Sequence, residues 1–160
     1  MNSRLVSPRG PRPSELRRVP GIDYGDLESH FGYALRRAQI ASFEAFYRAS
    51  AGAGITPPRF TALVILHANP GITQTTLGNV LGTARSGAML LADWLEERGL
   101  AERRSRADDG RVWGLFLTVK GEALLARLRR RVRENDAAFA RRLAPRERSS
   151  LIRLLNKLAG

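Results

Sequence analysis

Residues 73–99 contain two short helical patterns separated by a glycine, and this pair restricts the fold more than any other feature. Thr73 is a favourable N-cap for the first helix, which we expect to end before Gly82. Thr83 is the expected N-cap of the second helix, which ends at Gly99. Two short helices joined by a tight glycine-containing turn are typical of a helix-turn-helix.

The second helix of this pair has an unusual outer side. Leu91 and Leu95 recur at the spacing of a core face. The side opposite to them carries a mixed set of residues: Arg85, Ser86, Met89, Leu90 and Asp93. On an ordinary surface helix, the adjacent Met89 and Leu90 have no reason to lie on that side. A DNA groove gives them one, because apolar side chains contact thymine methyl groups there.

The rest of the chain predicts a mainly α fold with one small β-hairpin. Periodicity, capping residues and helix breakers indicate helices over residues 29–51, 57–68 and 118–143, and a final helix from Pro145. The turn sequence ADDGR lies between two strand-like segments, so we expect a hairpin over residues 100–117. Five apolar residues of the final helix are expected to face inward: Leu151, Ile152, Leu154, Leu155 and Leu158.

The charge of the chain favours an acidic partner. With 27 basic and 15 acidic residues the net charge is +12, and such a surface attracts phosphates and supplies sequence-independent affinity for nucleic acid. A membrane surface or RNA attracts the same charge, and nearly all the basic residues are arginines, a bias that a GC-rich genome also produces. The charge therefore agrees with DNA binding without proving it.

Composition removes several classes of function. The chain has no cysteine, which excludes disulfides, thiol nucleophiles and cysteine redox sensing. Two histidines are too few for a convincing zinc, copper or nickel site, so we expect no metal and no cofactor. No apolar run reaches the about 18 to 20 residues that span a bilayer, and the start of the chain lacks a signal-peptide core. We expect a cytoplasmic protein with no membrane partner.

Residues 1–26 differ in composition from everything that follows. They hold four prolines and five arginines with almost no apolar periodicity, which predicts a flexible basic arm. The arm is either a solvated tail or a segment that touches the DNA backbone or a partner subunit.

The first long helix has two apolar stripes instead of one. The first stripe consists of Phe31, Leu35, Ala38, Ser42 and Phe46. The second consists of Tyr33, Ile40, Phe43 and Tyr47, with Arg36 between the stripes. A helix that is apolar on two sides needs cover on both. Its own domain can cover one side, and a second subunit or a ligand cavity the other.

Taken in order and with the spacing between them, four stretches of the chain resemble the MarR family of winged helix-turn-helix repressors. They are LRRAQ, TPPRFTALVILHANPGITQTTLGNVLG, RSGAMLLADWLEERGLAERR and DGRVWGLFLTVKGEALL, and the resemblance covers about residues 32–158. The resemblance implies a homodimer formed by the N- and C-terminal helices, a helix that enters the major groove of a pseudo-palindromic operator, and a wing that reaches the minor groove. It divides the chain into the arm, a dimerisation region of residues 27–52 and 119–160, and a DNA-binding lobe of residues 53–118.

The resemblance also implies a set of DNA-binding residues. They are Thr73 and Gln74 at the helix that crosses the backbone, Thr83, Arg85, Ser86, Met89 and Leu90 at the groove helix, and Arg106, Asp109 and Arg111 in the wing. Asp109 and Arg111 match the family signature Asp-x-Arg, whose arginine suits a narrow minor groove. Two positions depart from the pattern: Leu90 lies near a common arginine, and Arg106 replaces a common acidic residue. Specificity is therefore expected to depend strongly on Arg111.

In most members of the family, a small and often aromatic anion releases the protein from DNA. The residues that offer an apolar wall and cationic donors for such an effector are Tyr33, Arg36, Arg37, Ile40, Phe43, Tyr47 and His67. The aromatic stripe could equally be dimer core, and His67 a structural hydrogen bonder. The effector is expected to be an aromatic carboxylate or its coenzyme A thioester. Five arginines within Arg127–Arg133 form either a solvated face or a phosphate site for that thioester.

Two other functions compete with that of a ligand-responsive repressor. An enzyme is not expected, because no carboxylate pair, nucleophile with base or phosphate-binding glycine loop is placed convincingly. An architectural protein that binds DNA or RNA without switching needs the basic face but no cavity. Steep salt dependence with little sequence preference would favour that alternative.

Overall fold

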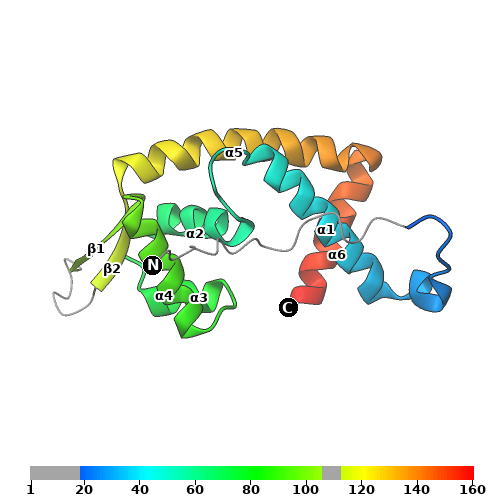
Figure 1. Cartoon of the computed structure of the whole chain (residues 1–160), viewed down its shortest axis with the longest axis horizontal. Coiled ribbons are helices and arrows are strands. Elements are labelled where there is room, and N and C mark those ends of the chain that lie inside the picture. Colours follow the sequence, from blue (N-terminus) through cyan, green and yellow to red (C-terminus); the bar gives the residue numbers. More distant parts are fainter. Residues whose placement is uncertain (1–18, 106–112) are drawn as a thin grey trace, which may run out of the picture. The chain divides into compact units, whose positions relative to one another are not determined.

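The computed structural model describes residues 19–105 and 113–160, and it confirms a mainly α fold with a two-stranded hairpin (Figure 1). Its elements in chain order are the 3-10 helix η2 (Gly25–Ser29), α1 (Phe31–Ala49), α2 (Pro57–Ala68), α3 (Gln74–Val80), α4 (Arg85–Glu97), β1 (Ala101–Ser105), β2 (Trp113–Leu117), α5 (Val119–Phe139), η3 (Ala140–Arg142) and α6 (Pro145–Ala159). The chain divides into two compact units between Ala45 and Phe46, within α1.

Threonines begin several of these helices. The hydroxyl of Thr73 accepts the N–H of Thr76 at 3.1 Å, and that of Thr118 accepts the N–H of Gly121 at 3.1 Å, so both are N-caps as expected. Thr56 precedes Pro57, the first residue of α2. The expectation for Thr83 was wrong. The N-cap of α4 is Ala84, whose side chain makes no capping hydrogen bond.

Thr83 is displaced from the cap by the tight turn between α3 and α4. Its N–H donates to the carbonyl of Gly78 at 3.0 Å, which ends α3 with a backbone hydrogen bond. Its hydroxyl lies where a Cβ on Gly87 would be, so glycine at position 87 leaves room for it. Thr83 therefore joins the two helices through its backbone and side chain and leaves the first N–H groups of α4 without a side-chain cap.

The hairpin is antiparallel and is joined to the loop before α3. Ala101 pairs with Leu117 and Ser105 with Trp113. A short bridge between Ile72 and Leu115 adds the α2–α3 loop to the free side of β2. The close approach requires a glycine in β2, because a Cβ on Gly114 would lie 2.6 Å from the carbonyl oxygen of Gly71. The base of the wing is thereby fixed to the helix-turn-helix.

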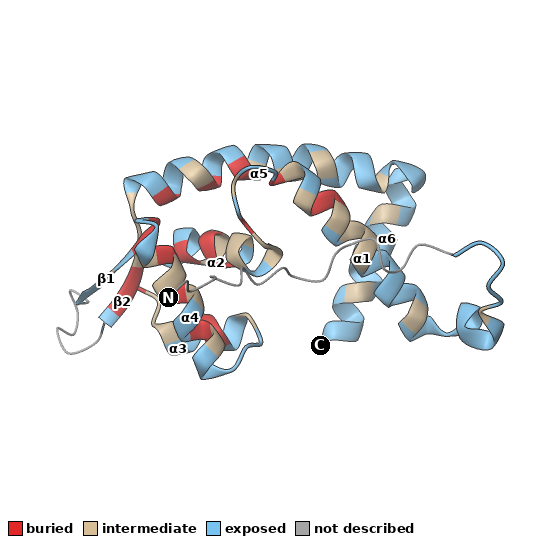
Figure 2. Cartoon of the chain, viewed as in Figure 1, coloured by how far each residue is buried: buried red, intermediate tan, exposed pale blue. Residues whose placement is uncertain are grey.

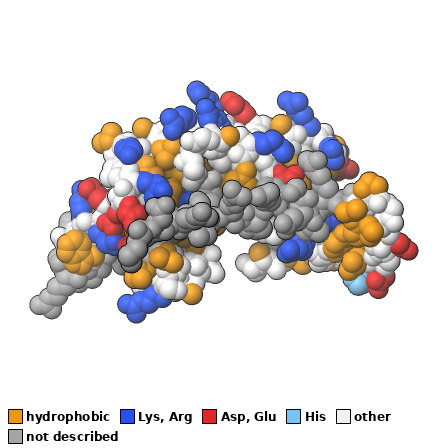
Figure 3. Space-filling view, viewed as in Figure 1, with side chains coloured by type: hydrophobic (Ala, Val, Ile, Leu, Met, Phe, Trp, Pro, Cys, Tyr) orange, Lys and Arg blue, Asp and Glu red, His pale blue; other side chains and the backbone are white. Residues whose placement is uncertain are grey.

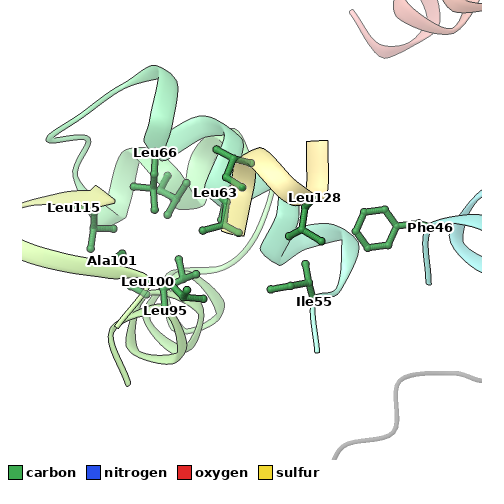
Figure 4. Close-up of a cluster of buried hydrophobic side chains, with 13 residues drawn as sticks. Phe46, Ile55, Leu63, Leu66, Leu95, Leu100, Ala101, Leu115 and Leu128 are labelled. Atoms are coloured by element: carbon green, nitrogen blue, oxygen red, sulfur yellow. The ribbon is translucent and has the colours of Figure 1, made fainter. Parts of the chain in front are cut away.

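A leucine-rich core holds the larger unit together. Leu63 and Leu66 of α2 meet Leu95 of α4, Leu115 of β2 and Leu128 of α5, and each is at most 1% exposed (Figure 4). Burying one such side chain contributes about 1.5 to 3 kcal/mol. Figure 2 shows that the buried residues of the larger unit concentrate in α2, α3, α4, the hairpin and the first half of α5.

The face of α6 differs from the sequence-based expectation. Instead of facing inward, Leu151, Ile152, Leu154 and Leu158 are exposed and Leu155 is half-buried in the single chain. The helical periodicity was correct, but no described element of the larger unit covers this stripe. An exposed contiguous apolar stripe marks a surface that another molecule covers.

The smaller unit includes the N-terminal part of α1 and the turn before it. Tyr24 accepts the N–H of Val19 at 2.9 Å through its hydroxyl, and its ring lies 6.4 Å from that of Tyr33. Residues 19–26, expected to belong to the arm, thus contain a turn and the start of η2; residues 1–18 lie outside the described part of the chain. Over the described ranges, no helix is both long enough and apolar enough to cross a membrane.

Candidate nucleic-acid interface

The N-terminal half of α4 presents the side chains that the sequence singled out. Arg85 and Ser86 are exposed at its start. Met89 is 47% exposed and Leu90 67%, although both are apolar residues within a helix of the lobe. The helix thus offers a guanidinium, a hydroxyl and two apolar side chains on one open surface, which suits readout of base edges and thymine methyl groups.

The opposite side of α4 explains why this surface is held rigidly. Ala88, Ala92 and Leu95 are at most 1% exposed and anchor the helix in the lobe. α3 approaches closely, because a Cβ on Gly78 would lie 2.9 Å from the Cβ of Ala88. Small residues at this contact fix the angle of the helix pair.

At the start of α3, the side chains of Thr73 and Gln74 both make hydrogen bonds within the lobe. Thr73 uses its hydroxyl to cap the helix, so its hydroxyl is already engaged. Gln74 is half-buried, and its side-chain oxygen accepts a hydrogen bond from Nη2 of Arg103 at 2.9 Å. In this structure Gln74 is therefore held by the lobe itself.

Arg103, on β1, is the centre of an ion-pair network that the sequence analysis missed. Nη2 lies 2.8 Å from Oδ1 of Asp93, and Nη1 pairs with the carboxylate of Glu96. The N–H of Arg103 also donates to Oε1 of Glu96 at 2.9 Å. Together with the bond to Gln74, these contacts tie the first strand of the wing to both helices of the helix-turn-helix. Asp93 is thus a partner of the wing.

A signal for this network existed in the sequence. Asp93 and Glu96 lie three residues apart and so share one side of a helix. Arg103 follows in a strand that must pass that helix. The spacing indicates a possible carboxylate pair, but only the fold selects Arg103 over its neighbour Arg104, which lies over the ring of Phe116 at 4.2 Å.

The wing residues Arg106, Asp109 and Arg111 lie outside the described residues, so their DNA-binding roles stay predictions. The base of the wing is described. Trp113, the first residue of β2, is 62% exposed next to Ser105 at the end of β1. Ser105 and Trp113 are thus the last paired residues of the described hairpin.

The expected effector residues are divided between the two units. Tyr33, Arg36, Arg37, Ile40 and Phe43 lie in the smaller unit, where the guanidinium of Arg37 is 5.8 Å from the ring centre of Tyr33. The larger unit contains Tyr47 and His67. Nδ1 of His67 lies 2.7 Å from Oε2 of Glu122, so His67 has a structural partner on α5. The effector role of these residues stays a prediction.

The arginine run Arg127–Arg133 lies along α5. Arg129 is half-buried and the other four arginines are exposed. Figure 3 shows basic side chains recurring along α5 on the face in view. Residues 127–133 therefore concentrate five positive charges within seven positions of α5.

Two short helices, the second with an open outer surface, and a hairpin fixed beside them define a winged helix-turn-helix, a class of DNA-binding fold. A model of the MarR family matches residues 53–112. A proposed transcriptional regulatory protein for the hcr operon of Thauera aromatica is 35% identical over 136 residues, which cover 84% of this chain and 82% of that protein. The chain belongs to the MarR family, and its relatives and fold are those of a transcriptional regulator, not an enzyme.

Solved structures support the same assignment. The repressor CouR bound to a 23-mer DNA duplex is 36% identical and has a TM-score of 0.81, covering 87% of this chain and 99% of that one. CouR bound to p-coumaroyl-CoA is 36% identical with a TM-score of 0.78, covering 86% and 97%. The regulator PcaV of Streptomyces coelicolor, in complex with its natural ligand, is 30% identical with a TM-score of 0.74, covering 86% and 97%.

Proposed function

We propose that this chain is a cytoplasmic repressor that binds a pseudo-palindromic operator and leaves it when a small effector binds. The observation that carries the proposal is the outer surface of α4, where Arg85, Ser86, Met89 and Leu90 are exposed on a helix anchored by buried residues. Such a surface fits a major groove, and the net charge of +12 supplies phosphate affinity. CouR, a similar repressor, was solved on DNA.

A homodimer is the form that would read such an operator. The exposed apolar stripe of α6 offers the surface that a second copy would cover, together with α1 and α5 in the region of residues 27–52 and 119–160. Two α4 helices related by a two-fold axis would then enter successive major grooves about 34 Å apart. The lobe of residues 53–118 would supply the DNA contacts, including Thr73, Gln74 and the wing.

For the effector we propose an aromatic carboxylate or its coenzyme A thioester. The support is chemical and comparative: the α1 residues offer aromatic rings with arginines beside them, and the similar CouR was solved with p-coumaroyl-CoA. Effector binding would favour a spacing of the two α4 helices that no longer fits the operator. A typical coupling of about 1 to 3 kcal/mol lowers operator affinity about 5- to 150-fold.

Arg111→Ala tests the DNA-binding mode. The operator is first selected from randomised duplexes, and dissociation constants are then measured by fluorescence anisotropy at fixed salt. Removing the wing arginine should cost at least about 1 kcal/mol of binding free energy. Arg130→Ala, which removes the same charge from an exposed site on α5, is the control. Equal affinities for the two variants would refute the wing contact.

Effector release is tested on the same operator complex. Benzoate, 4-hydroxycinnamate and their coenzyme A thioesters are screened for a shift in melting temperature, and the hits are retested for release of DNA. Release by one member of the series supports the repressor. Sequence-independent binding with steep salt dependence and no release supports the architectural alternative.

A further inference from the structure

A basic cavity of about 430 Å³ lies within the larger unit, between the end of α4 and the first half of α5. Arg98, Lys120 and Arg127 line it, and Leu100 and Leu124 give it an apolar wall. Cavities of about 300 to 1,000 Å³ with an apolar wall and a few convergent polar groups are typical of small-molecule sites.

Trp94, which also lines the cavity, concentrates further positive charge there. The guanidinium carbons of Arg59 and Arg98 lie 3.8 and 4.1 Å from the centre of its ring. Nη1 of Arg59 also donates a hydrogen bond to the carbonyl of Gly54 at 3.1 Å. Burial first, and then repulsion from Arg98, lower the pKa of Arg59. The two guanidinium groups are thus close enough to oppose each other's charge.

Little negative charge compensates these cations within the described part of the chain. Arg98 has a long ion pair with Glu97 at 3.9 Å, and both side chains are largely exposed. Lys120 donates to the backbone carbonyl of Arg98 at 2.6 Å and so adds its charge to the same place. Arg127 has no ion pair among residues 19–105 and 113–160. Gathering like charges beside a cavity costs free energy that a bound anion would recover.

We propose that this cavity binds an organic anion whose carboxylate or phosphate contacts Arg98, Lys120 and Arg127, with its apolar part on Leu100 and Leu124. The inference goes beyond the proposed function by placing an anion at residues outside the α1 effector set, and of these residues only Arg127 belongs to the arginine run expected as a solvated face or a phosphate site. Of the arginine run, only Arg127 lines the cavity, so the proposed anion site does not require the other four arginines. Carboxylate and phosphate share the chemistry that cationic side chains lining one cavity recognise.

Trp94 provides a direct readout. The chain has two tryptophans, so Trp113→Phe leaves Trp94 as the single fluorophore. The full-length variant is titrated with benzoate, inorganic pyrophosphate and coenzyme A, each up to about 1 mM at constant ionic strength. We expect saturable quenching by at least one of the three. Benzoate alone identifies a carboxylate site, and pyrophosphate or coenzyme A a phosphate site.

Arg127→Gln in the same background tests the position of the site. We expect it to raise the dissociation constant of the bound probe at least fivefold, because it removes one charged donor. Arg133→Gln, an exposed position six residues further along α5, removes the same charge away from the cavity and should leave the constant within twofold. No quenching by any of the three probes overturns the proposal, and so does equal weakening by the two variants. DNA binding is not measured, so failure here leaves the repressor untouched.

Discussion

The leucine core of the larger unit and the apolar stripe of α6 consist of the same kind of residue, but the core is buried and the stripe is exposed to solvent. Leu63, Leu66 and Leu95 are at most 1% exposed, because helices and the hairpin of one chain surround them. Leu151 and Leu154 are 45% and 48% exposed on a helix with equally regular spacing. The spacing of apolar residues therefore predicts that a face needs cover, and the fold decides whether the same chain supplies it.

The core and the stripe are expected to contribute to stability in different ways, one independent of protein concentration and the other dependent on it. The leucine core can form in a single chain, so its contribution does not depend on protein concentration. If a second copy covers the α6 stripe, the contribution of that stripe follows mass action and grows with concentration. Two substitutions test this contrast directly, and two with smaller expected effects test single contacts within the larger unit.

Leu63→Ala should lower the free energy of unfolding by about 2 to 5 kcal/mol, because it leaves a cavity in the centre of the core. The loss should be the same at low and high protein concentration in urea-induced unfolding. Val119→Ala is the control, since Val119 is 89% exposed and its truncation should change stability by less than about 0.5 kcal/mol. A loss for Leu63→Ala as small as that of the control would contradict the assigned core.

Leu154→Glu should act on association. A charge placed in the α6 stripe should raise the dimer dissociation constant at least about a hundredfold, or about 2.7 kcal/mol, as at an interface hot spot. Sedimentation equilibrium measures it. Asn156→Glu, at an exposed position on the side of the helix opposite Leu154, introduces the same charge and should leave the constant much closer to that of the unchanged chain. Matching dissociation constants for the two variants would show that another surface makes the dimer.

Arg103→Gln should affect DNA binding more than stability. It leaves the partly exposed carboxylates of Asp93 and Glu96 without their cation and should cost about 1 to 2 kcal/mol of stability. Since the wing then loses its fixed position against α4, operator affinity should fall about tenfold, which anisotropy titration measures. Arg104→Gln, on the exposed side of β1, is the matched control. Equal operator affinities would mean that the network does not position the wing.

Thr73→Ala should have the smallest effect, about 1 kcal/mol, because it removes the hydroxyl that caps α3. Thermal unfolding measures the change. Thr75→Ala, at the exposed second position of the same short helix, should be neutral within about 0.5 kcal/mol. If both variants lost the same stability, the cap would contribute nothing beyond helix propensity.

Capping residues and helix breakers predicted most elements, and where they failed the error was confined to a few neighbouring residues. The bounds of α2 were predicted to the residue, because Thr56-Pro57 starts the helix and the Asn-Pro-Gly sequence ends it. The start of α4 was misplaced by one residue, because Thr83 has the propensity of a cap but is used in the turn with Gly78 and Gly87. Propensity describes a residue in isolation, and a tight turn overrides it.

The candidate interface was predictable only in part, because some of its contacts join residues that are distant in the sequence. Exposure of Met89 and Leu90 followed from helical period and was confirmed. The tie from Arg103 to Gln74 joins residues 29 positions apart, and no periodicity within one element can reveal it. The positions of Asp93 and Glu96 were readable, but their partner was not.

The sequence by itself determined the order of the elements, most helix starts and the resemblance to a family, because caps, turns and period are properties of neighbouring residues. Only the tertiary structure decided which apolar faces the chain covers, which arginine locks the wing strand to α4, and that Trp94 holds Arg59 and Arg98 beside a basic cavity. These outcomes depend on elements that are distant in sequence meeting in space, where burial and charge are set by all the neighbours at once.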